Sequence, residues 1–291
     1  MQQAFEDVLT HVAFGELPQP DDPRAVDAWL AGRGLSGVDA ERFRREIGRW
    51  VVYRELVRRR LRETVRLAVP RSVARLGPLF DEYFSRFLAE RGPRTHYLRE
   101  VTTELLDFCE PLFAGDPRVP AYALDLARHE ALGVAVASAV ERPRGARELG
   151  ELDLERGLVF IESARVVRYG FAVHRLPADE ADRSEPERRP AALFVYRSAE
   201  HEVRYLEVTP ICAEILERLL AGDSLRLALE GACQAEGAAL DAGVVDGTAA
   251  VLADLAERGA VLGGADGAGP RDLPAGQSPP TMLGSGDSRQ R

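Results

Sequence analysis

Arginine is concentrated in one segment of this chain, Glu41–Arg75. The segment holds 12 arginines and four glutamates, so its charge is 12 minus 4, or +8, whereas the 291-residue chain as a whole carries −9. Guanidinium groups bind phosphates and carboxylates, and a basic helical stretch releases counterions when it binds nucleic acid. The segment therefore predicts a surface for an anionic partner, which could be DNA, an acidic protein or the acidic second half of this chain.

Arg54 differs from the other arginines of this segment in where it falls on a helix. At about 100° per residue it lies within the apolar stripe to which Trp50 and Leu61 belong. A buried guanidinium needs a carboxylate, so we expect Arg54 to form a structural ion pair with Asp125 or Glu130. The arginines outside the stripe are expected to form a partner-docking surface made of Arg58, Arg59, Arg62 and Arg66.

The residues that usually carry catalysis do not form a recognisable site. All 38 basic residues are arginine, which excludes Schiff-base and P-loop lysine chemistry. No HxxxH, CxxC, HExxH or GxSxG motif is present. These absences exclude several classes of enzyme, and we expect no self-contained zinc site and no cofactor. His129 is flanked by charges in a core helix, which favours a core or interface histidine over a ligand or a proton shuttle.

Neither a signal peptide nor a membrane span is predicted. The first ten residues, MQQAFEDVLT, lack a basic flank followed by an apolar stretch. The longest uncharged apolar run, residues 131–140, is about half of what a membrane span needs. The three cysteines are widely spaced in apolar surroundings, which predicts buried thiols. We therefore expect a cytoplasmic protein.

Apolar periodicity predicts an all-helical first half, residues 1–145. Between residues 40 and 69 apolar side chains recur every three or four positions, as in one long amphipathic helix. Pro70 ends this helix because proline lacks a backbone donor and restricts the residue before it. Further helices are expected from Pro78 to before Gly92, over residues 96–109 and over residues 120–140.

After residue 147 the pattern changes to the β-branched and aromatic alternation of strands. Strands are expected over residues 158–161, 166–173, 192–196 and 203–208, and helices over residues 210–221, 224–236 and 244–258. This order predicts an α+β fold in which the N-terminal helical bundle is followed by a winged-helix-like domain, residues 150–263, with a β-sheet and three helices. The tail, residues 264–291, is rich in Gly, Pro and Ser and is expected to be disordered.

The second domain has the wrong charge for a winged helix that reads DNA. Residues 187–257 contain 13 acidic residues and six arginines, so this domain repels phosphate. Its strands do offer a sheet edge to which an extended peptide could add as a further strand. The domain therefore favours peptide recognition over DNA recognition.

Several segments resemble the HvfC/BufC-type family, which was first described as DNA-binding. Residues 3–9 (QAFEDVL), Val52-Tyr53-Arg54 and the run Asp125-Leu-Ala-Arg-His-Glu130 are similar to its N-terminal domain. The run Leu206-Glu-Val-Thr-Pro-Ile-Cys-Ala-Glu-Ile-Leu is similar to its C-terminal domain. That domain also resembles the peptide-recognition winged helices of the pyrroloquinoline-quinone chaperone type.

The resemblance implies a function, a partner and a binding site. Better understood members are partner subunits of iron-dependent TIM-barrel enzymes, which modify cysteines in ribosomally made peptides, as in methanobactin and bufferin biosynthesis. By this resemblance the chain is a non-catalytic subunit that docks on such an enzyme and presents a precursor peptide, and the metal belongs to the enzyme. The peptide would lie along Val203, Tyr205 and Glu207 and the helix over residues 244–255. A transcriptional regulator that binds DNA through the arginine face of residues 42–75 is the alternative.

Overall fold

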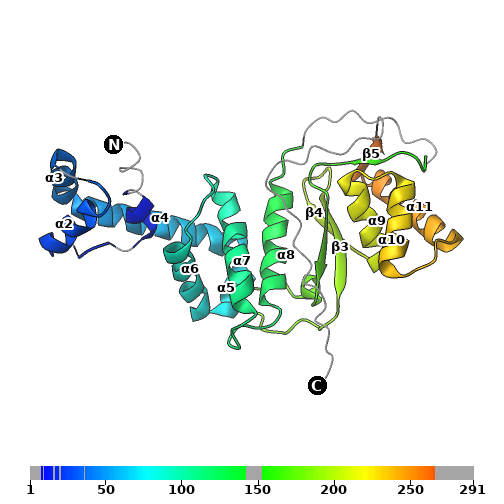
Figure 1. Ribbon diagram of the computed structural model, residues 1–291. Helices are drawn as coiled ribbons and strands as arrows, with labels where there is room; N and C mark the ends of the chain where they lie inside the picture. Colours follow the sequence, from blue (N-terminus) through cyan, green and yellow to red (C-terminus); the bar gives the residue numbers. More distant parts are fainter. Residues whose placement is uncertain are drawn as a thin grey trace, which may run out of the picture. The chain divides into compact units, whose positions relative to one another are not determined.

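The computed structural model describes residues 8, 10–15, 17–19, 21–35, 37–141 and 153–265. Helices dominate this part of the chain and are accompanied by two small antiparallel sheets, so the fold class is α+β, as expected (Figure 1). Internal contacts divide the chain into two compact units. Unit 1 comprises Met1–Glu141 and Glu162–Val208, and unit 2 comprises Arg142–Ile161 and Thr209–Arg291.

Unit 1 begins with a series of helices, coloured blue to green in Figure 1. They are α2 (Pro23–Ala31), α3 (Gly37–Arg45), α4 (Ile47–Ala68), α5 (Pro70–Leu76), α6 (Pro78–Glu90), α7 (Leu98–Phe113) and α8 (Ala123–Ala137). Pro23, Pro70 and Pro78 each lie in the first turn of a helix, where a missing N–H removes no hydrogen bond. The expected helix start at Pro78 is thereby confirmed.

The single helix expected over residues 40–69 is wrong. The chain leaves helical geometry at Glu46, where φ is −106° and ψ is 10°, so α3 and α4 are separate helices. Next to this break Phe43 stacks on Trp29 and on Trp50, with ring centroids 5.7 Å and 5.4 Å apart. These stacking contacts join α2, α3 and α4, and apolar periodicity within one segment does not reveal them.

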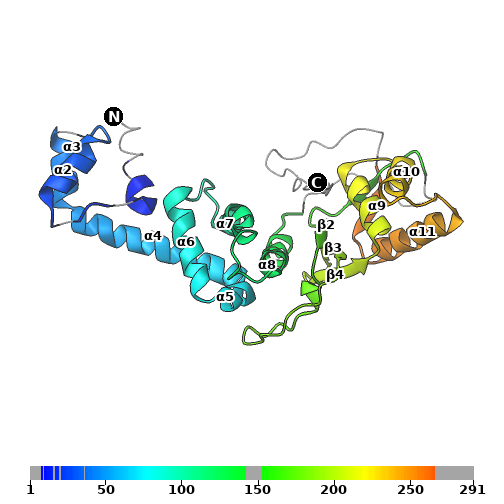
Figure 2. The same cartoon turned by 60° about the horizontal axis from the view of Figure 1, so that its bottom comes forward.

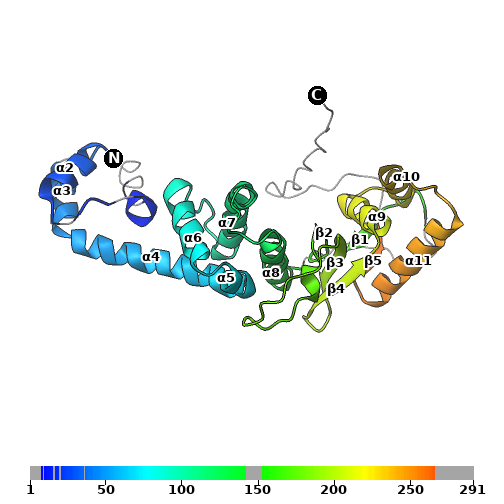
Figure 3. The ribbon, with the colours of Figure 1, turned by 90° about the horizontal axis from the view of Figure 1, so that it is seen from below.

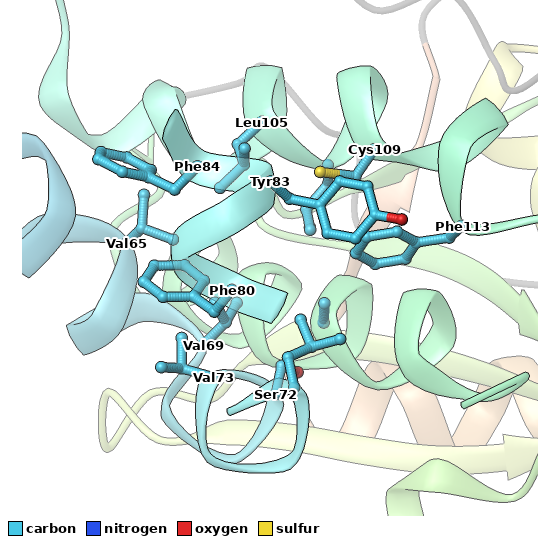
Figure 4. A pocket seen from close by; sticks show the side chains of 13 residues that line it. Val65, Val69, Ser72, Val73, Phe80, Tyr83, Phe84, Leu105, Cys109 and Phe113 are labelled. Atoms are coloured by element: carbon cyan, nitrogen blue, oxygen red, sulfur yellow. The ribbon is translucent and has the colours of Figure 1, made fainter. Parts of the chain in front are cut away.

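The main core of unit 1 includes side chains of α4, α6, α7 and α8. An apolar cavity of about 20 Å³ remains within it (Figure 4). Such a space could hold one water molecule only with free polar partners around it. The two hydroxyl groups of its lining already have partners, since Tyr83 donates to Asp116 and Ser72 donates to Glu130. The cavity is therefore a packing gap and not a binding site.

A three-stranded antiparallel sheet belongs to unit 1 as well. Its strands, in the order β2–β3–β4, are β2 (Arg165–Tyr169), β3 (Ala191–Arg197) and β4 (Val203–Val208). α8 lies beside this sheet, and Leu126 of α8 shares a core with Leu193 and Val195 of β3 (Figure 2). From the sequence we expect a domain boundary between α8 and these strands. In the structure they share a core because α8 is apolar on two sides, with Ala123 and Ala127 packed in the helical core.

The described part of unit 2 contains three helices and a two-stranded sheet. The helices are α9 (Pro210–Ala221), α10 (Leu225–Glu236) and α11 (Ala242–Glu257), and the strands are β1 (Leu158–Phe160) and β5 (Val261–Gly264). Each helix follows a residue whose side chain accepts a backbone N–H of the first turn, namely Thr209, Ser224 and Asp241. Gly222 and Gly237 end α9 and α10 in the left-handed conformation, which glycine adopts at little cost. These local signals explain why the sequence located the three helices.

The strands expected in one winged-helix-like domain are divided between the two units. β1 pairs with β5, whereas β2, β3 and β4 form the sheet of unit 1. β5 was not predicted because two of its four residues are glycine. It ends at Gly264, the first residue of the expected disordered tail, and residues 266–291 of that tail lie outside the described residues. Within the described ranges no helix is both long enough and apolar enough to cross a membrane.

Candidate functional site

β4 is an edge strand of the sheet in unit 1. It pairs with β3 in a register that sets Arg204 opposite Tyr196. At the end of this hairpin the Ser198 N–H donates to the Glu202 carbonyl over 2.8 Å. On its other side β4 pairs with no strand within the described residues. A strand with one open side can accept an extended peptide as an additional strand.

The backbone groups on the open side of β4 follow from this register. In an antiparallel ladder, pairs of opposed residues that exchange hydrogen bonds alternate with pairs that do not. Counting in steps of two from the bonded pair Ser198 and Glu202 places the even-numbered residues of β4 in bonded pairs with β3. The N–H and C=O groups of the odd-numbered residues therefore point outward. These residues are Val203, Tyr205 and Glu207, the three that the family resemblance implies for peptide binding.

The side chains of these three residues lie on the side of the sheet that faces α8. Val203 packs against the core that α8 and β3 share. The ring centroids of Tyr205 and His129 are 4.9 Å apart. A Cβ atom on Gly133 of α8 would lie 2.7 Å from the Tyr205 hydroxyl, so this glycine leaves the space that the tyrosine occupies. Tyr205 is still 38 % exposed, and its surface is accessible to a peptide.

Glu207 is the centre of a charged cluster. Its carboxylate accepts hydrogen bonds from Arg175 over 2.9 Å and from Arg189 over 2.8 Å, and it lies 3.1 Å from Nε2 of His174. Arg189, then Arg175 and His174, lower the pKa of Glu207 to about 2. The carboxylate is therefore ionised near neutral pH and offsets one of the two guanidinium charges.

Acid is expected to release this cluster. Because the pKa of Glu207 is lower in the folded state, its contribution to stability is complete above its ordinary value of 4.5 and is lost as the pH falls toward about 2. In that window the melting temperature of the wild-type protein should fall more steeply with pH than that of Glu207→Gln, whose side chain does not titrate. Circular dichroism during heating at several pH values measures both slopes. Equal slopes would show that the cluster adds nothing to stability.

A buried pair of aromatic rings lies next to Tyr205. His129 is 7 % exposed, and its pKa is lowered to about 4 by burial and by the charges of Arg71 and His174. The Tyr169 ring stands edge-on to it with a centroid distance of 5.6 Å, and burial raises the pKa of Tyr169 well above its usual range. Both side chains are therefore neutral near neutral pH. His129 is a buried core histidine, which is the interpretation that the sequence favoured.

Glu130 connects α8 to the beginning of α5. One carboxylate oxygen accepts hydrogen bonds from the backbone N–H and the Nε of Arg71. The other accepts from the backbone N–H and the hydroxyl of Ser72. The two backbone groups belong to the first turn of α5, whose N–H groups have no partner within the helix, and a negative charge is favourable there. The sequence does not predict this connection, because Glu130 and Arg71 are 59 positions apart in the chain.

The ion pair expected between Arg54 and Asp125 or Glu130 is not formed. Among the described residues Arg54 donates to the backbone carbonyls of Val12 and Gly15. The Asp125 carboxylate accepts two backbone N–H groups of the loop that follows β2. Carbonyl groups at the end of a helical segment, here residues 10–14, can bind a guanidinium. The projection of a single helix could not show this partner.

The four arginines expected to form a docking surface fall into two groups, of which one is bonded within unit 1 and the other is exposed. Arg58 donates to two backbone carbonyls close to the N-terminus, and Arg62 binds both carboxylate oxygens of Asp81 over 2.7 Å and 2.8 Å. These two arginines hold parts of unit 1 together. Arg59 and Arg66 are exposed on α4 and form no ion pair with any described residue. A docking role for the exposed pair remains a prediction.

The thiols and the possible metal ligands do not form a reactive centre within the described residues. That part of the chain has no group of three His, Cys, Asp or Glu side chains placed to hold a metal ion. Burial raises the pKa of Cys109 to about 12 and that of Cys212 to about 11. Both groups are therefore protonated near neutral pH and are weak nucleophiles.

Part of the chain matches a known family. Residues 162–256 match the family model of the HvfC C-terminal domain. The matched residues include the open strand β4, the charged cluster around Glu207 and nearly all of α11. A comparison with curated proteins gave no match. The match confirms the expected resemblance for residues 162–256.

Proposed function

We propose that this chain, an HvfC-type protein by the match of residues 162–256, is a non-catalytic partner subunit of an enzyme. It docks on an iron-dependent TIM-barrel enzyme and presents a ribosomally made precursor peptide to it for cysteine modification. The observation that carries this proposal is the open edge of β4, which lies within the matched residues.

The open edge suits an extended peptide. The outward N–H and C=O groups of Val203, Tyr205 and Glu207 can bind the backbone of any sequence, and the neighbouring side chains can select among sequences. Tyr205 offers an aromatic surface, and the carboxylates of Glu207 and Glu187 balance the charges of Arg175 and Arg189. A peptide with an apolar residue near Tyr205 fits this edge best.

In this proposal the iron and the bond-making chemistry belong to the enzyme subunit. The contribution of this chain is to hold the peptide in one register beside the enzyme. A peptide bound at the strand edge is tethered to the complex, which raises the effective concentration of its cysteine at the enzyme's site. The chain thereby increases the rate of modification without contacting the reacting atoms.

Co-expression of this chain with the TIM-barrel enzyme encoded beside its gene tests the proposal. We expect the two proteins to elute as one complex in size-exclusion chromatography. The complex should modify the precursor peptide of the same gene cluster at least about tenfold faster than the enzyme alone, because tethering replaces a bimolecular encounter. Two separate peaks together with equal rates would contradict the proposal.

A further inference from the structure

α4 carries a line of apolar side chains on its solvent-exposed side. Val52, Leu56 and Leu67 are 59 %, 59 % and 77 % exposed. At about 100° per residue they fall within about 60° of one another around the helix axis. The distance along the axis from Val52 to Leu67 is about 22 Å. Figure 3 shows α4 as the long helix that connects α3 to α5.

Arginines border this apolar line on both sides. By the same projection Arg59 and Arg66 lie along one border, and Arg49 and Arg60 lie along the other. Arg59, Arg60 and Arg66 are exposed and pair with no acid among the described residues. Arg49 makes one contact of 3.9 Å with Glu46 while its side chain is 83 % exposed. The guanidinium groups of this side of α4 are therefore available to a partner.

The residues on this side of α4 favour a protein as the binding partner over a membrane or DNA. Glu63 projects into the apolar line, so a lipid surface would have to accept a carboxylate among the apolar side chains. DNA phosphates would bind the arginines but would leave Val52, Leu56 and Leu67 against a polar backbone. An acidic helix with its own apolar line covers these side chains and brings carboxylates to the bordering arginines. The four arginines remain in excess over the glutamates of this side, which are Glu55 and Glu63.

We propose that this surface docks an acidic amphipathic helix of the partner enzyme. We call it the α4 stripe, which is Val52, Leu56 and Leu67 with the four arginines that border them. The inference rests on the proposed function, which supplies the enzyme as the partner. A partner helix of about 15 residues, with apolar residues every three or four positions and Asp or Glu beside them, matches the length of the stripe.

Removal of the apolar line tests the inference. In the full-length chain, Leu56→Ser combined with Leu67→Ser should raise the Kd for the co-expressed enzyme at least about tenfold, because buried apolar anchors dominate interfaces. The melting temperature should stay near that of the wild type, since both side chains are exposed. The matched control combines Val38→Ser with Leu227→Ser, which changes two exposed side chains outside α4, and it should leave the Kd unchanged.

Reversing the charge of two bordering arginines is a second test of the inference. Arg59→Glu combined with Arg66→Glu should also raise the Kd about tenfold and should make binding less sensitive to salt, because attractive charge pairs are lost. Full affinity of both α4 double variants would overturn the docking inference and leave the proposed function standing. Absence of a complex with the wild-type chain would overturn both. If the α4 double variants lose binding to duplex DNA or to phosphatidylserine vesicles but keep their affinity for the enzyme, the stripe binds that ligand and the inference is overturned.

Discussion

Glu130→Ala is expected to lower the free energy of unfolding by about 3–5 kcal/mol, the loss that is typical when one partner of a buried ion pair is removed. The Glu130 side chain is 6 % exposed and accepts hydrogen bonds from Arg71 and Ser72. Without it the buried guanidinium of Arg71 loses its carboxylate and the first turn of α5 loses the acceptor of two N–H groups. Each buried polar group left without a partner costs about 1–3 kcal/mol. Chemical denaturation followed by circular dichroism measures the change.

The matched control for this variant is Glu110→Ala. Glu110 also pairs with an arginine, Arg128, over 2.8 Å, but its side chain is 48 % exposed. Exposed ion pairs contribute only about 0–1 kcal/mol, so the control should lose little stability. Glu130→Gln keeps one carbonyl acceptor, so its loss of free energy of unfolding should lie between the losses of Glu130→Ala and Glu110→Ala. If Glu130→Ala loses no more stability than the control, the connection between α8 and α5 is not a major source of stability.

Tyr205→Pro is expected to weaken binding of the precursor peptide at least about tenfold, because it removes an outward N–H at the centre of the β4 edge. Proline is tolerated on edge strands when the lost N–H faces away from the sheet, so the chain should still fold. Fluorescence anisotropy with the labelled precursor peptide of the same gene cluster measures the Kd. The same titration applies to the full-length chain alone and to its complex with the enzyme.

Two further variants separate the backbone of β4 from its side chains. Tyr205→Ala removes the same ring but keeps the N–H, so its affinity for the peptide should exceed that of Tyr205→Pro. Arg204→Pro removes an N–H that the register directs toward β3, so it should lower the melting temperature further than Tyr205→Pro does. Equal peptide affinity of Tyr205→Pro and Tyr205→Ala would show that the peptide does not use the β4 backbone.

Several elements lie where the sequence predicted them because their signals are local. α9 occupies residues 210–221 and β4 occupies residues 203–208, as expected. Proline in the first turn, a glycine in the left-handed conformation after the last turn, and strand-like alternation each act over a few residues. The break between α3 and α4 was missed because it accompanies aromatic stacking with a third helix. Local signals therefore located most elements but not all of their ends.

The partners of charged side chains could not be predicted in the same way. Arg54 donates to a carbonyl 42 positions earlier in the chain, and Glu130 accepts from an N–H 59 positions earlier. The expected pairing of these two residues was wrong because each found a backbone partner that the projection of one helix does not contain. The pairing of β1 with β5 was missed for the same reason, since residues 161–260 separate the two strands.

From the sequence alone one can determine the charge of α4, the apolar periodicity that orients it, and the strand that contains Val203, Tyr205 and Glu207. The tertiary structure decided which arginines of α4 are used inside unit 1, since Arg58 and Arg62 bind there and Arg59 and Arg66 do not. It also decided that β4 has a strand partner on one side only among the described residues, and that its odd-numbered residues face the other side. The physical reason is that periodicity belongs to residues adjacent in the chain. Hydrogen-bond partners and sheet edges depend instead on which distant segments the folded chain brings together.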